Sequence, residues 1–334
     1  MISVGVNGYG VIGKRVAHAV KLQDDMKLVG AAKRDADYKA RAALRNGIPM
    51  YCSGDPAKFR ESGIECKGTL DDLLSSVDIM IDCTPEGFGE ENKKLYEKAG
   101  VKAIWQGGEE HELTGLSFNA YASYDKALGA KFVRVVSCNT TGLIRTLYPL
   151  RKEFGIKQVK ALLVRRAADP SETKKGPINA LEPDTSMPSH HGPDVQTVMP
   201  DVNIDTVAMK APTTLMHLHY INVKLAKPAS RDKVLDAWRG YHRITLFSVK
   251  EGVKSTAQVM DYARDLWRPR GDLYEIAVWE DIKVVGDELH YFQAVHQEAD
   301  VVPENIDAVR AMLELEMEGG KSVAKTDSSL GIGV

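Results

Sequence analysis

The first half of the chain alternates between short apolar runs and longer amphipathic or polar stretches. The apolar runs predict strands at Ile2–Val6, Lys27–Ala32, Val77–Cys83, Val101–Trp105 and Phe132–Val136. The stretches between or after them predict helices at Lys14–Gln23, Thr69–Ser76, Glu90–Ala99 and Leu143–Phe154. Thr69, with Asp72 three residues later, has the pattern of a helix N-cap. Apolar strands separated by helices are typical of a parallel sheet that helices cover on both faces. The pattern therefore predicts an α/β fold built on a doubly wound parallel sheet.

The pattern changes near residue 140, where strands follow one another without regular helices between them. The expected strands are residues 157–166, Thr206–Ala208, Leu215–Leu225, Leu273–Trp279, Ile282–Val285 and Leu289–Val295. The expected helices are Arg231–Tyr241, Ser255–Arg264 and an amphipathic helix from Pro303 to about Gly319. Such an order is typical of an α+β domain with a mixed or antiparallel sheet. A long polar stretch from Ala167 to about Met199 interrupts it, and loops of that length are often functional.

Composition excludes several classes of function. The 334 residues suggest about two domains, and 27% charged with 43% hydrophobic residues is ordinary for a soluble protein. A net charge of -2 gives no reason to expect nucleic acid as a partner. The chain shows no apolar run of about 20 residues and no charged leader with a cleavage site, so we expect neither a membrane helix nor a signal peptide. Its four scattered cysteines favour a reducing cytoplasm over a disulfide framework or a metal site.

A glycine loop follows the first predicted strand and opens the first predicted helix. Gly8, Gly10 and Gly13 fit the G-x-G-x-x-G pattern of a dinucleotide-binding turn. The first glycine permits the tight turn, the second lets the backbone approach a pyrophosphate, and the third lets helix pack on strand. The helix N-terminus then offers N–H donors to the phosphates. We therefore expect a nucleotide-binding Rossmann domain over residues 1–138, a catalytic domain over residues 139–302, and a C-terminal segment, residues 303–334, whose helix packs back on the first domain.

The second predicted strand ends in a charged turn, about 20 residues after the glycine loop, where this fold meets the adenosine ribose. An acidic residue there favours the free 2′-hydroxyl of NAD, and Asp35 and Asp37 are both candidates. Lys33 and Arg34 precede them, however, and cationic side chains suit the 2′-phosphate of NADP. We therefore expect NADP, with NAD as a second cofactor; a solvated charged turn is the alternative interpretation.

Cys138 is the most distinctive chemical group of the chain. It follows the strand Phe132–Val136 and precedes a helix, so unpaired N–H groups and the positive helix end favour its thiolate, the nucleophilic form. The alternative is a small, buried, apolar cysteine. Because its strand continues the parallel series, Cys138 is expected at the same sheet edge as the glycine loop. A thiol beside a bound nicotinamide indicates hydride chemistry on a carbonyl.

A cysteine nucleophile needs a base, and the histidines supply the candidates. His217 and His219 share one face of a predicted strand, and either could take the thiol proton. The alternative for each is a packed or surface histidine, which is the commoner role of a histidine. His190 and His191 lie in the long polar stretch, where a substrate contact and a solvated turn are both open.

Phosphate donors are the remaining requirement of such a site. Arg166 offers a planar guanidinium, and Thr140 and Thr141 offer hydroxyls near a helix N-terminus. Arg165 and Arg166 point to opposite faces of a strand, so at most one of the two is expected to serve.

Taken together, several motifs resemble the archaeal type of phosphorylating glyceraldehyde-3-phosphate dehydrogenase over essentially the whole chain. The motifs are Asn7–Gly13, Ser137–Gly142, Ser189–Pro193, Thr214–His217, Gln297–Glu298 and Val302–Asn305. The chain departs from the bacterial and eukaryotic pattern, in which a second cysteine closes the nucleophile motif. Here Asn139 follows the nucleophile and Gly142 occupies the last place, as in the archaeal branch.

The resemblance implies a reaction and a set of roles. Cys138 would add to the aldehyde of glyceraldehyde 3-phosphate, hydride transfer to the nicotinamide would leave a thioester, and inorganic phosphate would release 1,3-bisphosphoglycerate. The catalytic histidine would be His217, with His219 as the alternate. Implied cofactor contacts are the Gly8–Gly13 loop with Val11 and Ile12, and Gly108, Arg166 and Gln297. Implied substrate or phosphate contacts are Cys138, Asn139, Thr140, Thr141, His190 and His191. The branch accepts NADP and often NAD, and its members are homotetramers.

Two other functions remain open from the sequence. One is a related thioester-forming enzyme, such as an aspartate-semialdehyde or N-acetylglutamyl-phosphate dehydrogenase, which would need a site for a substrate carboxylate. The other is a non-enzymatic dinucleotide-sensing module. The thiol, the histidines and Arg166 favour an enzyme, and no basic stripe with interleaved aromatic residues indicates nucleic acid.

Overall fold

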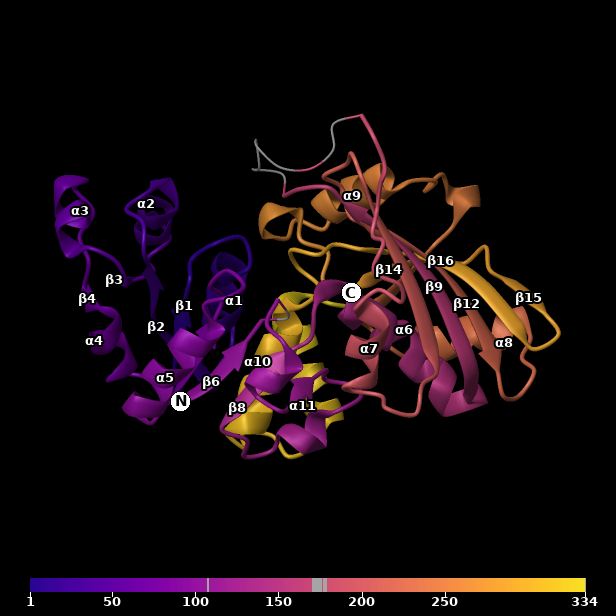
Figure 1. Ribbon diagram of the computed structural model, residues 1–334, viewed down its shortest axis with the longest axis horizontal. Coiled ribbons are helices and arrows are strands. Elements are labelled where there is room, and N and C mark those ends of the chain that lie inside the picture. Colours follow the sequence, from indigo (N-terminus) through magenta and orange to yellow (C-terminus); the bar gives the residue numbers. More distant parts are fainter. Residues whose placement is uncertain (107, 170–175, 177–178, 334) are drawn as a thin grey trace. The chain divides into compact units, whose positions relative to one another are not determined.

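The chain folds into two compact units, and Figure 1 shows their helices and strands coloured along the sequence. The first comprises Met1–Ser137 and Val302–Gly331, and the second comprises Cys138–Val301 and Ile332–Val334. The computed structural model describes residues 1–106, 108–169, 176 and 179–333, and the statements below concern these residues. Part of the long polar stretch expected from Ala167 to Met199 therefore lies outside the described residues.

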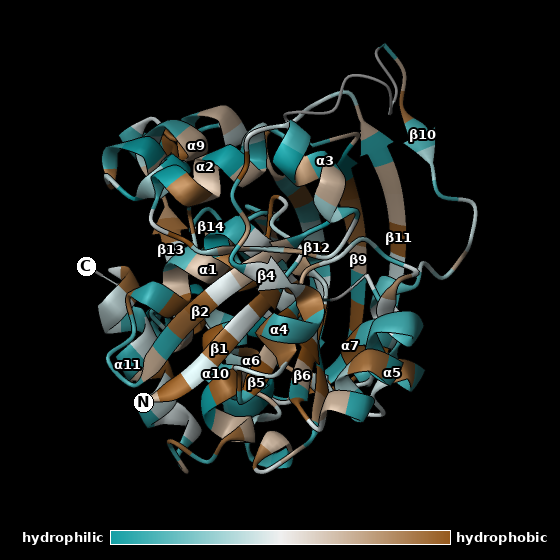
Figure 2. Ribbon diagram, turned by 90° about the vertical axis from the view of Figure 1, so that its left-hand side faces the viewer, coloured by the Kyte–Doolittle hydropathy of each residue, from teal (hydrophilic) through white to brown (hydrophobic). Residues whose placement is uncertain are grey.

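The first unit contains an eight-stranded sheet in which every pairing is parallel. Its order is β4-β3-β2-β1-β5-β6-β8-β7. The strands are β1 (Ile2–Asn7), β2 (Met26–Lys33), β3 (Met50–Cys52), β4 (Gly68–Thr69), β5 (Ile79–Asp82), β6 (Lys102–Trp105), β7 (Ser117–Phe118) and β8 (Phe132–Val135). Figure 2 shows apolar residues along β1 and β6, as expected for strands covered on both faces. The strand order reverses between β1 and β5, which makes their carboxyl ends the topological switch point. The predicted doubly wound sheet is confirmed.

The helices of the first unit connect these strands. They are α1 (Gly13–Lys21), α2 (Tyr38–Arg45), α3 (Pro56–Glu61), α4 (Leu70–Leu74), α5 (Gly89–Ala99), α10 (Val302–Met312) and α11 (Gly319–Leu330), with 3₁₀ turns at His111–Leu113 and Tyr124–Ala127. Thr69 caps α4 as predicted: its hydroxyl accepts from the Asp72 N–H, and the Asp72 carboxylate accepts from the Thr69 N–H. The local sequence pattern therefore located this helix start correctly.

The C-terminal helix differs from the prediction. α10 ends at Met312 instead of near Gly319, and all of its residues are buried, so it is not amphipathic. Its polar residues are buried with partners: Glu304 accepts from the Ala120 N–H, and Arg310 donates to Asp25 at 2.7 Å. α11, which follows it, was not predicted. Long-range polar contacts therefore satisfy side chains that the helical pattern assigned to a solvent-exposed face.

The second unit contains a mixed sheet with order β10-β11-β9-β12-β16-β14-β13, and β15 pairs with β16. The pairs β11–β9 and β13–β14 are parallel, and the others are antiparallel. The strands are β9 (Ile156–Arg166), β10 (Glu182–Pro183), β11 (Ile204–Ala211), β12 (His217–Leu225), β13 (Ile244–Phe247), β14 (Ile276–Trp279), β15 (Lys283–Val285) and β16 (Glu288–Val295). The predicted mixed sheet is confirmed.

Helices pack on both faces of this sheet. They are α6 (Cys138–Phe154), α7 (His191–Gln196), α8 (Arg231–Arg239) and α9 (Thr256–Asp265), with 3₁₀ turns at Val249–Glu251 and Pro269–Gly271. α6 lies on the face that carries Gln293, to which its Thr146 hydroxyl donates at 2.7 Å. α9 packs against Ala294, the next residue of β16, and therefore covers part of the opposite face.

The start of α6 also differs from the prediction. The helix begins at Cys138, five positions before the predicted Leu143. Threonine, asparagine and glycine have low helix propensity, so the local pattern indicated a loop. Packing explains the difference, because a Cβ at Gly142 would lie 2.6 Å from Val295 Cγ2 of β16. The glycine permits a close approach of helix and sheet, and this contact holds the first turn of α6 in place.

Candidate active site

Cys138 is the first residue of α6 and is partly accessible. Burial raises the pKa of its thiol from 9.0 to about 12, and the Asp300 carboxylate acts in the same direction. Arg165, Arg166 and the Asn139 N–H lower that pKa. A charge at a helix N-terminus gains about 0.3–1 kcal/mol, which is less than one pKa unit and smaller than the effect of burial. The expectation that this position by itself yields a thiolate is therefore wrong for the chain alone.

Three histidines of the second unit, His191, His217 and His219, are buried, and burial lowers the pKa of each. The pKa falls to about 3 for His219 and to about 2 for His191, and lies well below 6.5 for His217. His219 contacts Asn139 Oδ1 through Nε2 at 2.9 Å and Gln293 Nε2 through Nδ1 at 3.1 Å. Both of its ring nitrogens are therefore occupied.

His191 is occupied in the same way, whereas His217 is not. His191 contacts Asn139 Nδ2 through Nε2 at 3.3 Å and Ser189 Oγ through Nδ1 at 3.1 Å. His217 accepts a hydrogen bond from the Arg166 N–H at Nδ1, at 2.9 Å. Among the described residues, Nε2 of His217 has no hydrogen-bond partner. The geometry therefore leaves His217 as the histidine of the three with a nitrogen available to a substrate.

The two adjacent arginines of β9 have different surroundings. Arg166 donates to Glu298 at 2.8 Å and to Asp169, and the Gln297 amide oxygen can accept from its Nη2 at 2.8 Å. Arg165 has no ion pair or hydrogen-bonding partner among the described residues, and its Nε is fully buried. The guanidinium of Arg166, which the sequence favoured as a phosphate donor, is therefore engaged by protein partners in this structure. Arg165 is the unpaired cation, and it acts on Cys138, His191, His217 and His219.

A polar hollow of about 260 Å³ lies beside Arg165. It is lined by Arg165, Glu182, Pro183, Asp184, Thr185, Ala208 and Lys210. Lys210 is paired with Glu182 at 2.7 Å, which leaves Arg165 as its unpaired cation among the described residues. In the sequence, Arg165 was only the alternative to its neighbour. The deciding signal is the ion pairing of Arg166, which depends on a residue more than 100 positions away.

The other expected substrate residues differ in whether they are buried or exposed. Thr140 and Thr141 are fully buried, and the Thr140 hydroxyl donates to Asp194 at 2.6 Å. Their hydroxyls are therefore not presented to a substrate in this structure, contrary to expectation. His190 is exposed, and its ring stacks on that of His191 at 3.9 Å. Of the two loop histidines, His190 is the one that a substrate can reach.

The glycine loop of the first unit has the geometry that a pyrophosphate needs. Gly8 has a φ of +96°, and a Cβ there would lie 2.6 Å from the Cys83 carbonyl oxygen. A Cβ at Gly13 would lie 1.8 Å from the Gly8 carbonyl oxygen, whereas a Cβ at Gly10 would meet nothing within 4 Å. Gly8 and Gly13 are therefore required by the turn itself, and Gly10 leaves space for a ligand. No side chain caps α1, which begins after Val11 and Ile12.

In the charged turn after β2, one acidic side chain makes structural contacts and one cationic side chain is exposed. Asp37 caps α2 by accepting from the Lys39 and Ala40 N–H groups, and it pairs with Lys33 at 3.0 Å. Arg34 is exposed, and its guanidinium lies 5.0 Å from the ring centre of Phe88. The acidic side chain is therefore engaged, and Arg34 is the cation presented at this edge of the sheet.

Two further expected cofactor residues lie in different units. Gly108 is exposed and follows β6, at the same carboxyl edge as the glycine loop. Gln297 belongs to the second unit, where it is buried beside Arg166.

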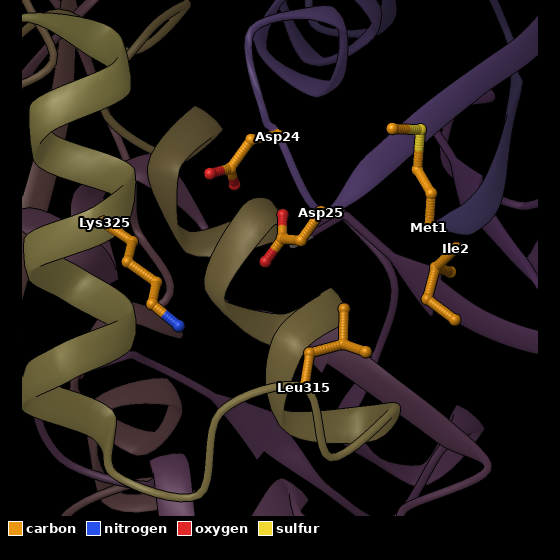
Figure 3. A pocket seen from close by; sticks show the side chains of 6 residues that line it. All are labelled: Met1, Ile2, Asp24, Asp25, Leu315 and Lys325. Carbon is orange, nitrogen blue, oxygen red and sulfur yellow. The ribbon is translucent and has the colours of Figure 1, made fainter.

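A larger hollow in the first unit, of about 580 Å³, has no such features. Figure 3 shows its lining, which consists of Met1, Ile2, Asp24, Asp25, Leu315 and Lys325. It lies where β1 and β2 begin, whereas ligands of doubly wound sheets bind at the carboxyl ends of the strands. Asp25 is paired with Arg310 and Lys325 with Glu316, so two of its three charged side chains already have partners. We therefore assign it no ligand.

Two classes of feature are missing from the part of the chain that the structure describes. No helix there has the length and apolar character needed to cross a bilayer. The same residues include no group of three or more histidine, cysteine or acidic side chains arranged to hold a metal ion.

Comparisons with known proteins agree on both units. Residues 137–281 match the family model of the glyceraldehyde 3-phosphate dehydrogenase C-terminal domain. Residues 2–112 match the model of the dihydrodipicolinate reductase N-terminus. Over 99% of the chain, it is 54% identical to the glyceraldehyde-3-phosphate dehydrogenase of Methanobacterium bryantii, of which it covers 100%. It is 55% identical to the protein of that name from Pyrococcus furiosus, over 99% of both chains. It is 53% identical to the one from Thermoplasma volcanium, covering 98% of that protein.

These relatives match the chain from end to end, and a family model covers most of the unit that carries Cys138. The glycine loop fits the NAD(P) pyrophosphate in its turn geometry and its open space at Gly10. The chain therefore belongs to the glyceraldehyde-3-phosphate dehydrogenase family of NAD(P)-dependent oxidoreductases.

Proposed function

We propose that the protein carries out the glycolytic oxidation of D-glyceraldehyde 3-phosphate to 1,3-bisphosphoglycerate, with NAD(P)⁺ and inorganic phosphate, through a thioester on Cys138. The observation that carries the proposal is the placement of Cys138 at the start of α6, with the charge of Arg165, which has no ion-pair partner among the described residues, acting on it. The full-length relatives that bear the name glyceraldehyde-3-phosphate dehydrogenase support the substrate. They give no support to the semialdehyde dehydrogenases or to a non-enzymatic module.

The reaction balances with these residues in named roles. The Cys138 thiol gives up its proton, its sulfur adds to the aldehyde carbon, and protonation of the carbonyl oxygen gives a hemithioacetal. Bound NAD(P)⁺ would supply the hydride acceptor, and loss of the hydride and of the hydroxyl proton from the hemithioacetal would leave a thioester on Cys138. Phosphate oxygen then attacks the thioester carbon, releases the thiolate and forms the acyl phosphate. The thioester retains the free energy of oxidation that attack by water would dissipate.

His217 is the residue that we propose to serve Cys138 and the substrate oxygen. His219 and His191 have both ring nitrogens engaged, which supports this choice over them. With Nδ1 accepting from the Arg166 N–H, neutral His217 carries its proton on Nε2. In this state it donates a hydrogen bond to the carbonyl oxygen as the thiolate adds. To accept a proton on Nε2, its ring must give up the hydrogen bond from Arg166.

We propose that Arg165 binds phosphate during the reaction. A guanidinium recognises phosphate through paired N–H donors, and Arg165 has these donors unpaired among the described residues. The same charge lowers the pKa of Cys138 and opposes burial. His190, exposed beside this region, is a second contact for the substrate. Asn139, Thr140, Thr141 and His191 would then act as support for the site.

The cofactor roles follow from the geometry of the first unit. Gly8, Gly10 and Gly13, with Val11 and Ile12, would hold the pyrophosphate, and Gly108 would lie farther along the same edge. We propose that NADP is accepted, and NAD as well, because Asp37 caps α2 while Arg34 is free to meet a 2′-phosphate. Arg166 and Gln297 would contact the cofactor as a joined pair. The first unit would thus bind the cofactor and the second carry the chemistry.

We further propose that the protein is a cytoplasmic homotetramer. One row of apolar side chains crosses four strands on the sheet face opposite α6, in the order Val207, Leu162, Tyr220, Phe292. Val207 and Phe292 are 41% and 48% exposed. A flat apolar sheet face supports a self-complementary contact with a second copy. The four free cysteines support a reducing compartment.

One assay tests the central proposal. Purified protein is mixed with glyceraldehyde 3-phosphate and NADP⁺, with and without phosphate, and reduced cofactor and product are measured. We expect turnover that requires phosphate and yields 1,3-bisphosphoglycerate, and mass spectrometry should find the acyl adduct on Cys138 when phosphate is left out. Cys138→Ser should abolish both. Activity confined to an amino-acid semialdehyde, or turnover to 3-phosphoglycerate without phosphate, would contradict the proposal.

A further inference from the structure

Six buried side chains of the second unit form one continuous row of hydrogen bonds next to Cys138. We call this row the relay; its members, in order, are Gln293, His219, Asn139, His191, Ser189 and Thr206. They come from β16, β12, α6, the first residue of α7, the segment that leads into α7, and β11. Their exposed fractions lie between 0% and 3%, so their hydrogen bonds are made with each other and not with solvent.

The Thr206 end fixes the direction of these hydrogen bonds. The Thr206 hydroxyl donates its one proton to the Ser189 carbonyl oxygen at 2.9 Å and accepts from the Gly192 N–H at 3.0 Å. The contact of 2.8 Å between the two hydroxyls must therefore be a donation from Ser189 to Thr206. Because the Ser189 proton is used there, Ser189 Oγ can only accept from His191 Nδ1.

The same donor-to-acceptor direction can be assigned to the hydrogen bonds of both histidines without a conflict. His191 carries its proton on Nδ1, so its Nε2 accepts from Asn139 Nδ2. Asn139 Oδ1 is then free to accept from His219 Nε2–H. His219 Nδ1 in turn accepts from Gln293 Nε2. Each residue thus donates toward Thr206, and each histidine holds its proton on one stated nitrogen.

The far end of the relay is compatible with this direction. Gln293 Oε1 accepts from the Thr146 hydroxyl at 2.7 Å, as it must if Nε2 faces His219. Thr146 Oγ1 then has a lone pair for the Tyr291 hydroxyl at 2.9 Å. The Thr146 contact is therefore compatible with the orientation that the Thr206 end requires, and the Thr146 hydroxyl also lies 3.2 Å from the Gly142 carbonyl oxygen and 3.3 Å from that of Leu143.

We propose that Asn139 and Gln293 are positioning residues, which lock His219 and His191 in single tautomers so that proton exchange at the active site passes through His217 alone. The inference rests on the proposed function, since it assigns roles within the same site. Asn139 accepts from one histidine and donates to the other, which a carboxylate in its place could not do. Gln293 supplies the donor that keeps His219 Nδ1 without a proton. His217 lies outside the relay, on the same face of β12 as His219.

The charges around the relay act in the same direction as its hydrogen bonds. Arg165 on β9 lowers the pKa of His219 and of His191, as does the neighbouring His190 for His191. Further charged or titratable groups among the described residues of this region are His217 on β12, Cys138 on α6, Arg166 on β9, Asp194 on α7 and Asp300. Burial is the largest cause of both low histidine pKa values. A second proton on either ring would therefore require a new carboxylate partner.

Two substitutions supply that partner, and a third serves as the control. Gln293→Glu places an oxygen opposite His219 Nδ1, and Asn139→Asp places one opposite His191 Nε2, so each should let the facing histidine take a second proton. Tyr291→Phe removes a buried hydroxyl from the same part of β16, yet Thr146 still donates to Gln293 and the direction is unchanged. The enzyme is assayed with glyceraldehyde 3-phosphate, NADP⁺ and phosphate across pH 5–9, an interval of about two units on either side of neutral.

We expect Gln293→Glu and Asn139→Asp to add an ionisation to the kcat/KM profile and to lower kcat on the order of 10- to 100-fold, the range in which groups that orient catalytic residues act. Tyr291→Phe should keep a profile of wild-type shape and lose only thermal stability. The proposal would be overturned if the kcat/KM–pH profiles of Gln293→Glu and Asn139→Asp had the same shape as the profile of Tyr291→Phe.

Neutron diffraction of the wild-type enzyme with NADP⁺ gives a second measurement, which does not depend on how the variants fold. Nuclear density should place deuterons on His219 Nε2 and His191 Nδ1. Deuterons on His219 Nδ1 or His191 Nε2 would overturn the proposal. These positions are independent of the substrate, whereas the assay with Cys138→Ser tests the reaction itself. Failure of the relay and failure of the proposed function are therefore distinguishable.

Discussion

Two glycines of the same loop should respond differently to alanine, because one is closed by the protein and the other is open to a ligand. A Cβ at Gly13 would lie 1.8 Å from the Gly8 carbonyl oxygen and 3.2 Å from Cys83 Cβ. The first obstacle is backbone held in a tight turn, so it cannot move aside as a flexible side chain would. A Cβ at Gly10 would meet nothing within 4 Å, so Gly10→Ala is the matched control.

The magnitudes follow from these contacts. Overpacking of a buried site costs about 1–3 kcal/mol. Replacing glycine by alanine returns about 0.4–1 kcal/mol through the unfolded chain. Gly13→Ala should therefore destabilise the first unit by about 1–2 kcal/mol, or about 2–8 °C in Tm for a domain of this size. Gly10→Ala should keep wild-type stability, yet raise the Kd of NADP at least about tenfold, because its methyl group would occupy the space of the pyrophosphate.

Denaturant unfolding and a fluorescence titration with NADPH measure the two effects separately. Gly13→Ala should lose stability without added cofactor, and Gly10→Ala should lose cofactor affinity alone. Wild-type affinity in Gly10→Ala would refute the assignment of this loop to the pyrophosphate. Wild-type stability in Gly13→Ala would refute the close contact from which the cost is derived.

Three further predictions concern the second unit. His217→Asn should slow oxidation by about 10²- to 10⁴-fold at unchanged Tm, as measured by stopped-flow detection of NADPH formation. A decrease in rate of less than about threefold would assign the proton transfer to another residue. Arg165→Gln should raise the KM for glyceraldehyde 3-phosphate or phosphate on the order of 10-fold or more without loss of stability. Arg166→Gln should instead cost about 1–3 kcal/mol of unfolding free energy, because it removes the guanidinium that pairs with buried Glu298. Equal effects of both variants on stability would contradict the difference in pairing. Burial depresses the folded pKa values of His191 and His219 from 6.5 to about 2 and about 3. The free energy of unfolding should therefore be full above pH 6.5 and should fall below it by about 1.4 kcal/mol per histidine for each pH unit. Urea unfolding between pH 7 and pH 5 measures this, and a constant unfolding free energy would refute the neutrality of the two histidines.

Features of the protein that depend on neighbouring residues could be predicted from its sequence. The spacing of Gly8, Gly10 and Gly13 between a strand and a helix indicated the dinucleotide turn, because its geometry is built from consecutive residues. Alternating strands and helices predicted the parallel sheet, and their absence later in the chain predicted the mixed sheet. The capping of α4 by Thr69 was equally local. The sequence also placed Cys138 between a strand end and a helix start, and its role as the nucleophile stays a prediction.

Which side chains are free to act depends instead on the tertiary structure. Arg165 and Arg166 are adjacent and chemically alike, but Glu298 pairs with one of them and not the other. His217 and His219 are separated by one residue, yet Gln293 reaches His219 through the register of β12 with β16. Burial also reversed the expected pKa of Cys138, and long-range partners made α10 a buried helix. Each of these outcomes depends on contacts between residues far apart in the chain, which a local pattern of polar and apolar positions does not encode.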